Sequence, residues 1–237
     1  MIFLSFIASF YFFIILCRLT LFRFTLNFNR KKLVITVEGN VGSGKSTMIK
    51  ILKDAKLQNQ GICIVDEPVQ VWKYTGILEK YYSPDTFLGR SLARPIYEFQ
   101  SFAVITHDNS IQTALQKYDI IITERCPETH SKVFFDLYKE QGLVDAVQTA
   151  MYNVIMNMVK TKPDAMIYLE TDIDNSLTRI KERGRPEEAN ISRNYISQVH
   201  DKHLELVDNF NGPILRIDAN YNKHHILQEI LDFIHYQ

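Results

Sequence analysis

The stretch Gly39-Asn40-Val41-Gly42-Ser43-Gly44-Lys45-Ser46-Thr47 follows directly on an apolar run, Leu33-Val34-Ile35-Thr36-Val37. It matches the pattern G-x-x-x-x-G-K-[ST] without a mismatch, and residues 48–55 after it read as a helix. In such a strand, loop and helix unit the backbone N–H groups of the loop turn toward a polyphosphate, and the helix N-terminus adds partial positive charge. Lys45 is expected to reach the outer phosphates and Ser46 to offer its hydroxyl to Mg²⁺. Residues 39–47, the phosphate loop, therefore predict a nucleotide-binding site.

Length and charge limit the classes of protein that fit. The chain has 237 residues, enough for one α/β domain with a sizeable core. Its formal net charge is zero, but residues 1–32 hold five of the 27 basic residues and no acidic one, which leaves 22 basic against 27 acidic residues in the rest. A net-acidic body without a basic run argues against a nucleic-acid partner. Three widely spaced cysteines without a C-x-x-C pair indicate neither a disulfide framework nor a zinc site, and they favour a reducing compartment.

Residues 2–17 are apolar apart from two serines and a tyrosine, and basic residues follow them. The run is slightly shorter than the ~20 residues of a bilayer-spanning helix. Three interpretations stay open: a membrane tether that keeps the body in the cytoplasm, a mitochondrial address, or residues from an upstream start codon that the working protein does not need. We therefore expect an extension over residues 1–32 and a domain over residues 33–237. Membrane contact is expected only through residues 2–17, and the expected location is cytoplasmic, with a mitochondrial alternative.

Further apolar runs that read as strands begin at residues 62, 120, 165 and 214, and helical stretches over residues 94–117 and 146–160 separate some of them. Strands that alternate with helices predict a three-layer α/β domain with a five-stranded parallel sheet flanked by helices. In such sheets ligands bind at the carboxyl edge of the strands, where the phosphate loop also lies.

Two carboxylates, Glu67 and Glu124, end separate predicted strands at this edge. One could hold Mg²⁺ together with Ser46, and the other could accept the proton of an attacking hydroxyl; phosphoryl transfer needs both groups. Residues alone leave open which acid has which role, and whether one of them is only a helix cap or a surface acid.

The segment over residues 179–188 places three arginines, Arg179, Arg183 and Arg185, around a glycine. Such a cluster can close over phosphates and neutralise the charge of a transition state. A solvated helix face is the alternative, but the Gly-Arg-Pro break favours a mobile lid. We call residues 179–188 the lid segment.

Together these features resemble the deoxyribonucleoside kinases, the family that includes deoxycytidine, deoxyguanosine and mitochondrial thymidine kinases. The resemblance extends from about residue 33 to the C-terminus, and five motifs carry it in the family's order: Glu-Gly-Asn-Val-Gly-Ser-Gly-Lys-Ser-Thr over residues 38–47, Glu67-Pro68-Val69 with Trp72, Phe99-Gln100-Ser101-Phe102, Glu124-Arg125, and Arg183-Gly-Arg185-Pro-Glu-Glu188. It implies a P-loop kinase fold, ATP and Mg²⁺ as cofactors, transfer of the γ-phosphate to the 5′-hydroxyl of a deoxynucleoside, and a homodimer.

The resemblance also implies roles for the reacting groups. Glu67 would be the base on the 5′-hydroxyl, and Arg125 would steady that carboxylate and the reacting oxygen. Glu124 and Ser46 would hold Mg²⁺. The groups on the transferring phosphates would be Lys45 and the lid arginines Arg179, Arg183 and Arg185.

For the acceptor, the resemblance implies that Gln100 binds the edge of the base through its amide. Trp72 and Phe134 would line the base pocket, and Tyr82 with Glu188 would hold the 3′-hydroxyl. Tyr82 is set farther from Gln100 than in familiar members, and Tyr81 lies beside it.

Two departures from the family pattern bear on function. The usual Glu-Arg-Ser is Glu124-Arg125-Cys126 here, and we expect Cys126 to act as a small buried side chain rather than a nucleophile. His107 and His130 stand where relatives carry an Arg and Asp pair, or an apolar pair, that discriminates between bases. With an unperturbed pKa near 6.5, either histidine could gain charge in mild acid. We expect a pyrimidine preference, with thymidine first and deoxycytidine close behind.

The other histidines lack acidic or cysteine partners at metal-binding spacing, and we expect them at the surface: His200, His203, His224 and His225.

Two other functions fit the sequence less well than the kinase. A nucleoside monophosphate kinase such as thymidylate kinase would bring a doubly negative acceptor to Glu67, which repels it. A membrane-tethered NTPase switch would leave Gln100, Trp72 and the lid arginines unexplained. The sequence therefore favours a deoxynucleoside kinase.

Overall fold

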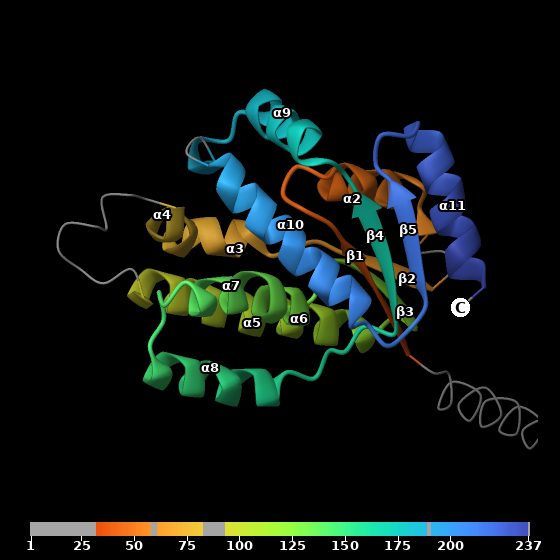
Figure 1. Cartoon of the computed structure of the whole chain (residues 1–237). Coiled ribbons are helices and arrows are strands. Elements are labelled where there is room, and N and C mark those ends of the chain that lie inside the picture. The colour runs from red at the N-terminus through yellow and green to blue at the C-terminus, as the bar shows by residue number, and fades with distance from the viewer. Residues whose placement is uncertain (1–31, 58–60, 83–92, 189–190, 237) are drawn as a thin grey trace, which may run out of the picture. The chain divides into compact units, whose positions relative to one another are not determined.

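The computed structural model describes residues 32–57, 61–82, 93–188 and 191–236 (Figure 1). The chain divides into two units, Met1–Lys32 and Leu33–Gln237, and the second contains the elements of the fold. The predictions for a tether or an organelle address fall on residues 1–31 and so lie outside the described residues. Within the described ranges, no helix is both long and apolar enough to cross a membrane.

A five-stranded parallel sheet forms the centre of the domain. Its strands are β1 (Leu33–Glu38), β2 (Ile62–Val65), β3 (Ile120–Glu124), β4 (Ala165–Glu170) and β5 (Ile214–Asp218), in the order β2-β3-β1-β4-β5. Val37 of β1 lies opposite Glu124 on one side and Ile167 on the other. The predicted five-stranded parallel sheet is confirmed. The phosphate loop leaves the central strand, so strands on both sides can deliver side chains to it.

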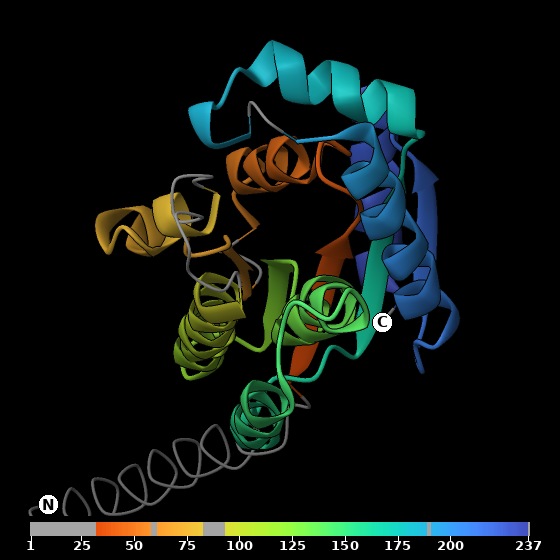
Figure 2. The same ribbon diagram turned by 60° about the vertical axis from the view of Figure 1, so that its left-hand side comes forward.

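Helices cover both faces of the sheet, as Figures 1 and 2 show. On β4, Ile167 and Leu169 pack in the core shared with α2 (Lys45–Asp54) and α11 (Lys223–His235). Met166 and Tyr168 alternate with them and pack in the core shared with η3 (His130–Phe135) and α10 (Arg193–Asp208). Because side chains alternate across a strand, an apolar run such as residues 165–169 of β4 must be covered on both faces.

The remaining helices complete the two outer layers and the rim of the site: α3 (Val69–Tyr74), α4 (Ile77–Tyr82), α5 (Ala93–Leu115), α6 (Pro127–Thr129), α7 (Asp136–Glu140), α8 (Ala146–Met158), α9 (Ile173–Arg183) and η4 (Pro186–Glu188). Helices α5 and α8 both end two residues before the predicted ends. Helix α8 ends at Met158 because the next residue, Val159, has extended backbone angles. The start of α8 is fixed by a capping box, in which Asp145 and Gln148 each accept a hydrogen bond from the other's backbone N–H.

The expectation that the other histidines lie at the surface is wrong for His203. His224 and His225 are exposed, but His203 on α10 is fully buried. It follows Val199 by four residues, and this spacing places both side chains on the inward face of the helix. The periodicity of the apolar residues in α10 could have revealed the burial.

Candidate active site

The phosphate loop joins the end of β1 to the start of α2. Gly39 has φ +144°, and a Cβ added there would lie 2.7 Å from both the Leu169 carbonyl oxygen and the Ser43 Oγ. Glycine is thus required at this close approach. Lys45 Nζ donates to the carbonyl oxygens of Gly39 at 2.8 Å and Asn40 at 2.7 Å. The ammonium group is therefore held over the loop.

The electrostatic surroundings of Lys45 are unusual for a lysine. Its side chain is buried, and burial together with the positive charge of Arg125 lowers its pKa to about 7. Nearby carboxylates, Glu124 and Glu67 first among them, oppose this shift. A ligand with several negative charges would raise the pKa of Lys45 again.

Ser46 and Glu124 form the second element of the site. Ser46 Oγ donates to Glu124 Oε1 at 2.6 Å, so the first turn of α2 meets the end of β3. Burial and the neighbouring carboxylate of Glu67 raise the pKa of Glu124. Two hard oxygen donors side by side suit Mg²⁺, which usually takes one or two protein oxygens and completes its shell with phosphates and water. Among the described residues there is no cluster of three or more His, Cys, Asp or Glu side chains that would hold a metal by itself.

Glu67 and Arg125 form the third element. Arg125 Nη1 donates to Glu67 Oε2 at 3.1 Å, and the guanidinium lies 5.2 Å from the centre of the Phe134 ring. Arg125 has φ +62°, in the left-handed region that a residue with a side chain rarely adopts. Such a backbone persists where the surroundings fix it, and it often marks functional sites. Here it turns the guanidinium back toward Glu67, directly after β3 ends.

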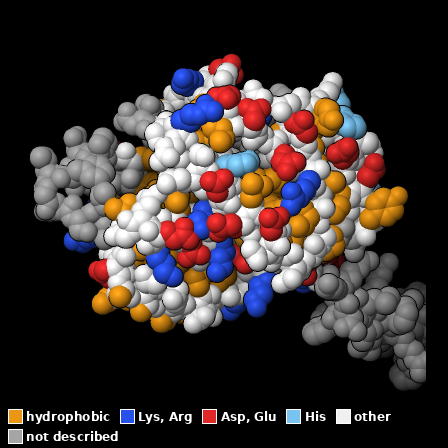
Figure 3. Space-filling model, viewed as in Figure 1, with side chains coloured by type: hydrophobic (Ala, Val, Ile, Leu, Met, Phe, Trp, Pro, Cys, Tyr) orange, Lys and Arg blue, Asp and Glu red, His pale blue; other side chains and the backbone are white. Residues whose placement is uncertain are grey.

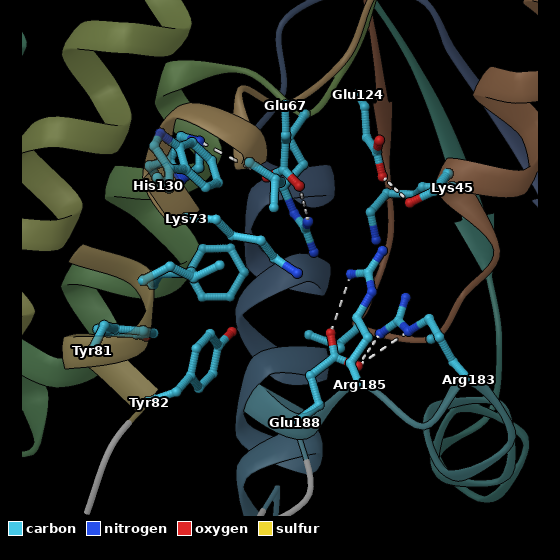
Figure 4. A pocket seen from close by; sticks show the side chains of 18 of the residues that line it. Lys45, Glu67, Lys73, Tyr81, Tyr82, Glu124, His130, Arg183, Arg185 and Glu188 are labelled. Carbon is cyan, nitrogen blue, oxygen red and sulfur yellow. Dashed lines mark hydrogen bonds and ion pairs between the residues drawn. The ribbon is translucent and has the colours of Figure 1, made fainter. Parts of the chain in front are cut away.

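The lid arginines divide into two groups. Arg179 donates to the carbonyl oxygens of Ser43 at 3.4 Å and Ala219 at 3.0 Å, so it rests against the phosphate loop. Arg183 donates to Glu188 Oε2 through Nε at 3.1 Å and Nη2 at 2.5 Å, and Arg185 Nη1 donates to Oε1 at 3.4 Å. Both oxygens of Glu188 thus accept from arginines, as Figure 4 shows.

A single cavity of about 470 Å³ connects these elements to an aromatic pocket. Its lining includes Lys45, Ser46, Glu67, Glu124, Arg125, Arg179, Arg183, Arg185 and Glu188, together with Trp72, Tyr82, Gln100, His130 and Phe134. The structure therefore brings together almost all side chains that the sequence selected.

The aromatic pocket is fixed by contacts among its own walls. Trp72 Nε1 donates to Thr106 Oγ1 at 2.9 Å, and its indole lies edge-on to Phe99 and His130. Gln100 is buried, and among the described residues its Oε1 has no hydrogen-bond partner. A buried amide oxygen without a partner is costly, so it marks a place where a polar ligand group can bind.

His107 is the exception among the residues selected for substrate binding, because it does not line the cavity. It is fully buried behind His130, with His107 Nδ1 3.2 Å from His130 Nε2 and His107 Nε2 3.0 Å from Thr123 Oγ1. The expectation that either histidine gains charge in mild acid is also wrong. Burial lowers the pKa of His107 to about 3 and that of His130 well below its usual value, and Arg125 adds to both shifts. Burial therefore favours the neutral form of both rings.

Cys126 is buried, and its pKa is raised to about 12, mainly by that burial. A thiol in such surroundings is a poor nucleophile.

Sequence reasoning missed Lys73, Tyr81 and Glu182, which also line the cavity. Figure 4 shows the Lys73 side chain extending into the cavity near Tyr82. Lys73 directly follows Trp72, and Glu182 directly precedes Arg183, so their places beside selected residues were the signals available. Tyr81 stacks on Phe99 at 4.4 Å between ring centres, and its hydroxyl lies 2.6 Å from that of Tyr138.

The sequence and the fold both match known proteins. The family model of the deoxynucleoside kinases matches residues 35–235. A probable deoxycytidine kinase of Fowlpox virus is 32% identical over 217 residues, which cover 84% of this chain and 87% of the relative. The thymidine kinase of Ictalurid herpesvirus 1 is 26% identical, with 85% and 86% covered. A solved structure of deoxyadenosine kinase from M. mycoides superposes with a TM-score of 0.70 at 22% identity, covering 86% of this chain and all of that one, and it shows the shared fold.

Proposed function

The chain belongs to the deoxynucleoside kinase family and transfers a phosphoryl group to a deoxynucleoside, and from this premise we propose the donor, the metal, the base and the residues that act. The donor is ATP with Mg²⁺, and the acceptor atom is the 5′-hydroxyl of a pyrimidine deoxynucleoside. The observation that carries the proposal is the position of Glu67, which Arg125 holds at 3.1 Å where the phosphate loop meets the aromatic pocket of the same cavity.

Glu67 accepts the proton of the 5′-hydroxyl as this oxygen attacks the γ-phosphate. Arg125 orients the carboxylate and keeps it on the side of the phosphate loop. Lys45 and Arg179 already contact loop carbonyls, so they lie where the donor phosphates would bind. Ser46 and Glu124 hold Mg²⁺, which when bound neutralises charge on the phosphate oxygens.

Arg183 and Arg185 leave Glu188 when the donor phosphates bind, and they then face the transferring group. The released carboxylate of Glu188, together with Tyr82, accepts the 3′-hydroxyl of the sugar. Support comes from the hydrogen bonds that Glu188 accepts from the two arginines, two at Oε2 and one at Oε1. The 3′-hydroxyl of the sugar would compete with the arginines for these oxygens.

The base binds between Trp72 and Phe134, with its polar edge on Gln100. The amide of Gln100 offers one donor and one acceptor, which suits the N3 and O4 edge of thymine or, flipped, the N3 and N4 edge of cytosine. His130 is neutral and beside Trp72, and His107 acts only through His130. Without a fixed charge pair next to Gln100, thymidine is the first choice and deoxycytidine the second.

A comparison of kcat/KM for the four deoxynucleosides, each with ATP, tests this preference. Thymidine is expected to rank first and deoxycytidine next, because the neutral pocket offers no charge to a purine edge. A purine ahead by more than about tenfold, or ~1.4 kcal/mol of transition-state stabilisation, would contradict the base assignment alone. Thymidine monophosphate serves as the control for the acceptor: turnover equal to that of thymidine would refute the role of Glu67 as base.

The proposed active form is a homodimer that buries one face of α8. Val147, Met151, Val154 and Met158 are 68%, 52%, 61% and 73% exposed, and their spacing places them on one face of the helix. Ile105 on the neighbouring α5 is also 53% exposed. Figure 3 shows hydrophobic side chains along the lower edge, where α8 lies in Figure 1. An apolar stripe of this kind suits a self-complementary interface between two copies.

The double substitution Met151→Glu and Val154→Glu is expected to convert the dimer to a monomer, because it would bury four like charges in a symmetric contact. Sedimentation equilibrium measures the mass. Asn153→Glu is the matched control, since Asn153 is exposed on the same helix but outside the stripe. A wild-type protein that sediments as a monomer, or a double variant that remains dimeric, would contradict this interface.

The cytoplasmic location, with its mitochondrial alternative, stays a prediction. The residues that bear on it lie outside those that the structure describes.

A further inference from the structure

Beneath the phosphate loop two ionisable side chains face each other in complete burial. Glu38 is the last residue of β1, and His203 belongs to α10; both are 0% exposed. The distance from His203 Nε2 to Glu38 Oε2 is 4.0 Å. Within the described part of the chain, neither atom has a hydrogen-bond partner. The roles assigned above use neither residue.

The tautomer of His203 follows from its other ring nitrogen. His203 Nδ1 lies 2.8 Å from the Val199 carbonyl oxygen, which can only accept, so Nδ1 carries the hydrogen. Burial lowers the pKa of His203 well below its usual value, and the positive charges of Arg125 and Lys45 lower it further. The ring is therefore neutral, and its Nε2 is an acceptor that faces Glu38.

Glu38 presents one satisfied and one unsatisfied oxygen. Its Oε1 accepts from Thr36 Oγ1 at 2.6 Å and from Thr129 Oγ1 at 2.5 Å. Its Oε2 faces the His203 acceptor at 4.0 Å, beyond a direct hydrogen bond, and two buried acceptors that face each other repel unless one of them carries a proton. Burial raises the pKa of Glu38, although the two threonine hydroxyls and the nearby cations oppose the shift.

We propose that Glu38 holds a proton on Oε2, the oxygen that faces the acceptor His203 Nε2, and that this neutral pair positions the entry to the phosphate loop. Glu38 continues directly into Gly39, whose carbonyl oxygen accepts from Lys45. Contacts from β1, α6 and α10 thus converge one residue before the loop. A charged Glu38 would instead attract Lys45 and Arg125, which face the donor and Glu67. Glu38 is a positioning residue that acts through the loop.

Other ionisable groups around the pair come from several elements. Cys126 and Tyr168 both have pKa values raised to about 12, mainly by burial, so neither titrates near neutral pH. Lys45, with a pKa of about 7, does titrate there. A charged Glu38 would raise the pKa of Lys45, whereas a neutral Glu38 leaves the contribution of Lys45 the same in the wild type and in Glu38→Gln. The groups facing the pair are Lys45, Arg125, Cys126, Tyr168 and His200.

Glu38→Gln tests the proton directly, because an amide copies a neutral acid. Its oxygen can accept from both threonines, and its NH₂ can donate to His203 Nε2. We expect kcat and KM for ATP within about threefold of wild type. Infrared spectra at pH 7.5 are expected to show the carbonyl band of a buried carboxylic acid in the wild type and not in Glu38→Gln. Glu170→Gln, at the end of neighbouring β4, is the matched control and keeps the band.

Stability provides a second readout with a defined sign. A group whose folded pKa is raised takes up a proton on folding at pH values above its unfolded pKa of 4.5. The stability that Glu38 contributes is therefore full below pH 4.5 and is lost as the pH rises toward the folded pKa. Relative to Glu38→Gln, the unfolding equilibrium constant of the wild type should rise with pH above 4.5, by up to about tenfold per pH unit, until the pH reaches the raised folded pKa of Glu38.

Glu38→Leu tests whether Glu38 positions the phosphate loop or only contributes to the packing of the core. It leaves both threonine hydroxyls and His203 Nε2 unpaired, and we expect KM for ATP to rise about tenfold or more, whereas a purely structural role would lower stability alone.

If Glu38→Leu does not fold, the kinetics of Glu38→Gln and the ¹⁵N chemical shifts of His203 in the wild type test the proposal. A neutral Nδ1–H ring from pH 6 to 8 supports the proposal. An imidazolium, a missing acid band, or a more than tenfold rise in KM for ATP in Glu38→Gln would overturn it.

Discussion

Replacing Glu67 by Gln is expected to lower kcat by about 10²-fold or more, with little change in KM for the deoxynucleoside. The amide has nearly the shape of the carboxylate, and its oxygen can still accept the hydrogen bond that Arg125 Nη1 now donates to Glu67 Oε2. The variant therefore keeps the geometry and loses only the ability to accept a proton. Steady-state kinetics with thymidine and ATP measure the effect.

Asp66→Asn is the matched control for this variant. Asp66 directly precedes Glu67 but is exposed and pairs with Lys53 on α2, away from the cavity. We expect wild-type kcat from it. A Glu67→Gln enzyme that turns over at the wild-type rate would show that another group accepts the proton, and the assignment of the base would then be wrong.

Residues with a local signal were placed correctly from the sequence. The glycines and Lys45 stand at fixed spacing after a strand, and the acids Glu67 and Glu124 end apolar runs. Both signals depend only on neighbouring residues in the chain. Once the strands form a parallel sheet, their carboxyl ends necessarily lie at the same edge, so no knowledge of distant contacts is needed to place these residues together. For this reason the phosphate loop and both acids line one cavity.

Features that depend on contacts between distant elements could not be read in this way. His107 lies behind His130 because α5 packs against η3, and the full burial of both rings removes the charge change expected from their ordinary pKa. The lid arginines have different partners: Arg179 contacts the phosphate loop, whereas Arg183 and Arg185 pair with Glu188 of η4, and this depends on how the chain turns after α9. His203 had a signal, its spacing from Val199, but its partner Glu38 lies 165 positions earlier in the chain.

Replacing Lys45 by Ala is expected to lower kcat/KM by about 10³-fold or more while the fold persists. Lys45 Nζ bonds two loop carbonyl oxygens, those of Gly39 and Asn40, and holds positive charge where the outer phosphates bind. The substitution removes this charge but leaves the apolar face of α2, Met48, Ile49 and Leu52, in the core. Circular dichroism is expected to show wild-type helix content, and coupled ATP consumption measures turnover.

Lys53→Ala is the control, because Lys53 belongs to the same helix but pairs with Asp66 outside the cavity.

A second measurement follows the charge of Lys45 directly, through the proton that it takes up when ATP binds. The pKa of Lys45 is lowered to about 7, so above pH 7 the free enzyme loses this proton and ATP binding must return it. Calorimetry at pH 8 in two buffers of different ionisation enthalpy should detect proton uptake by the wild type and by Lys53→Ala, and much less uptake by Lys45→Ala. Wild-type turnover in Lys45→Ala would refute the role of the phosphate loop, and equal proton uptake in all three proteins would show that a different group carries the charge to the phosphates.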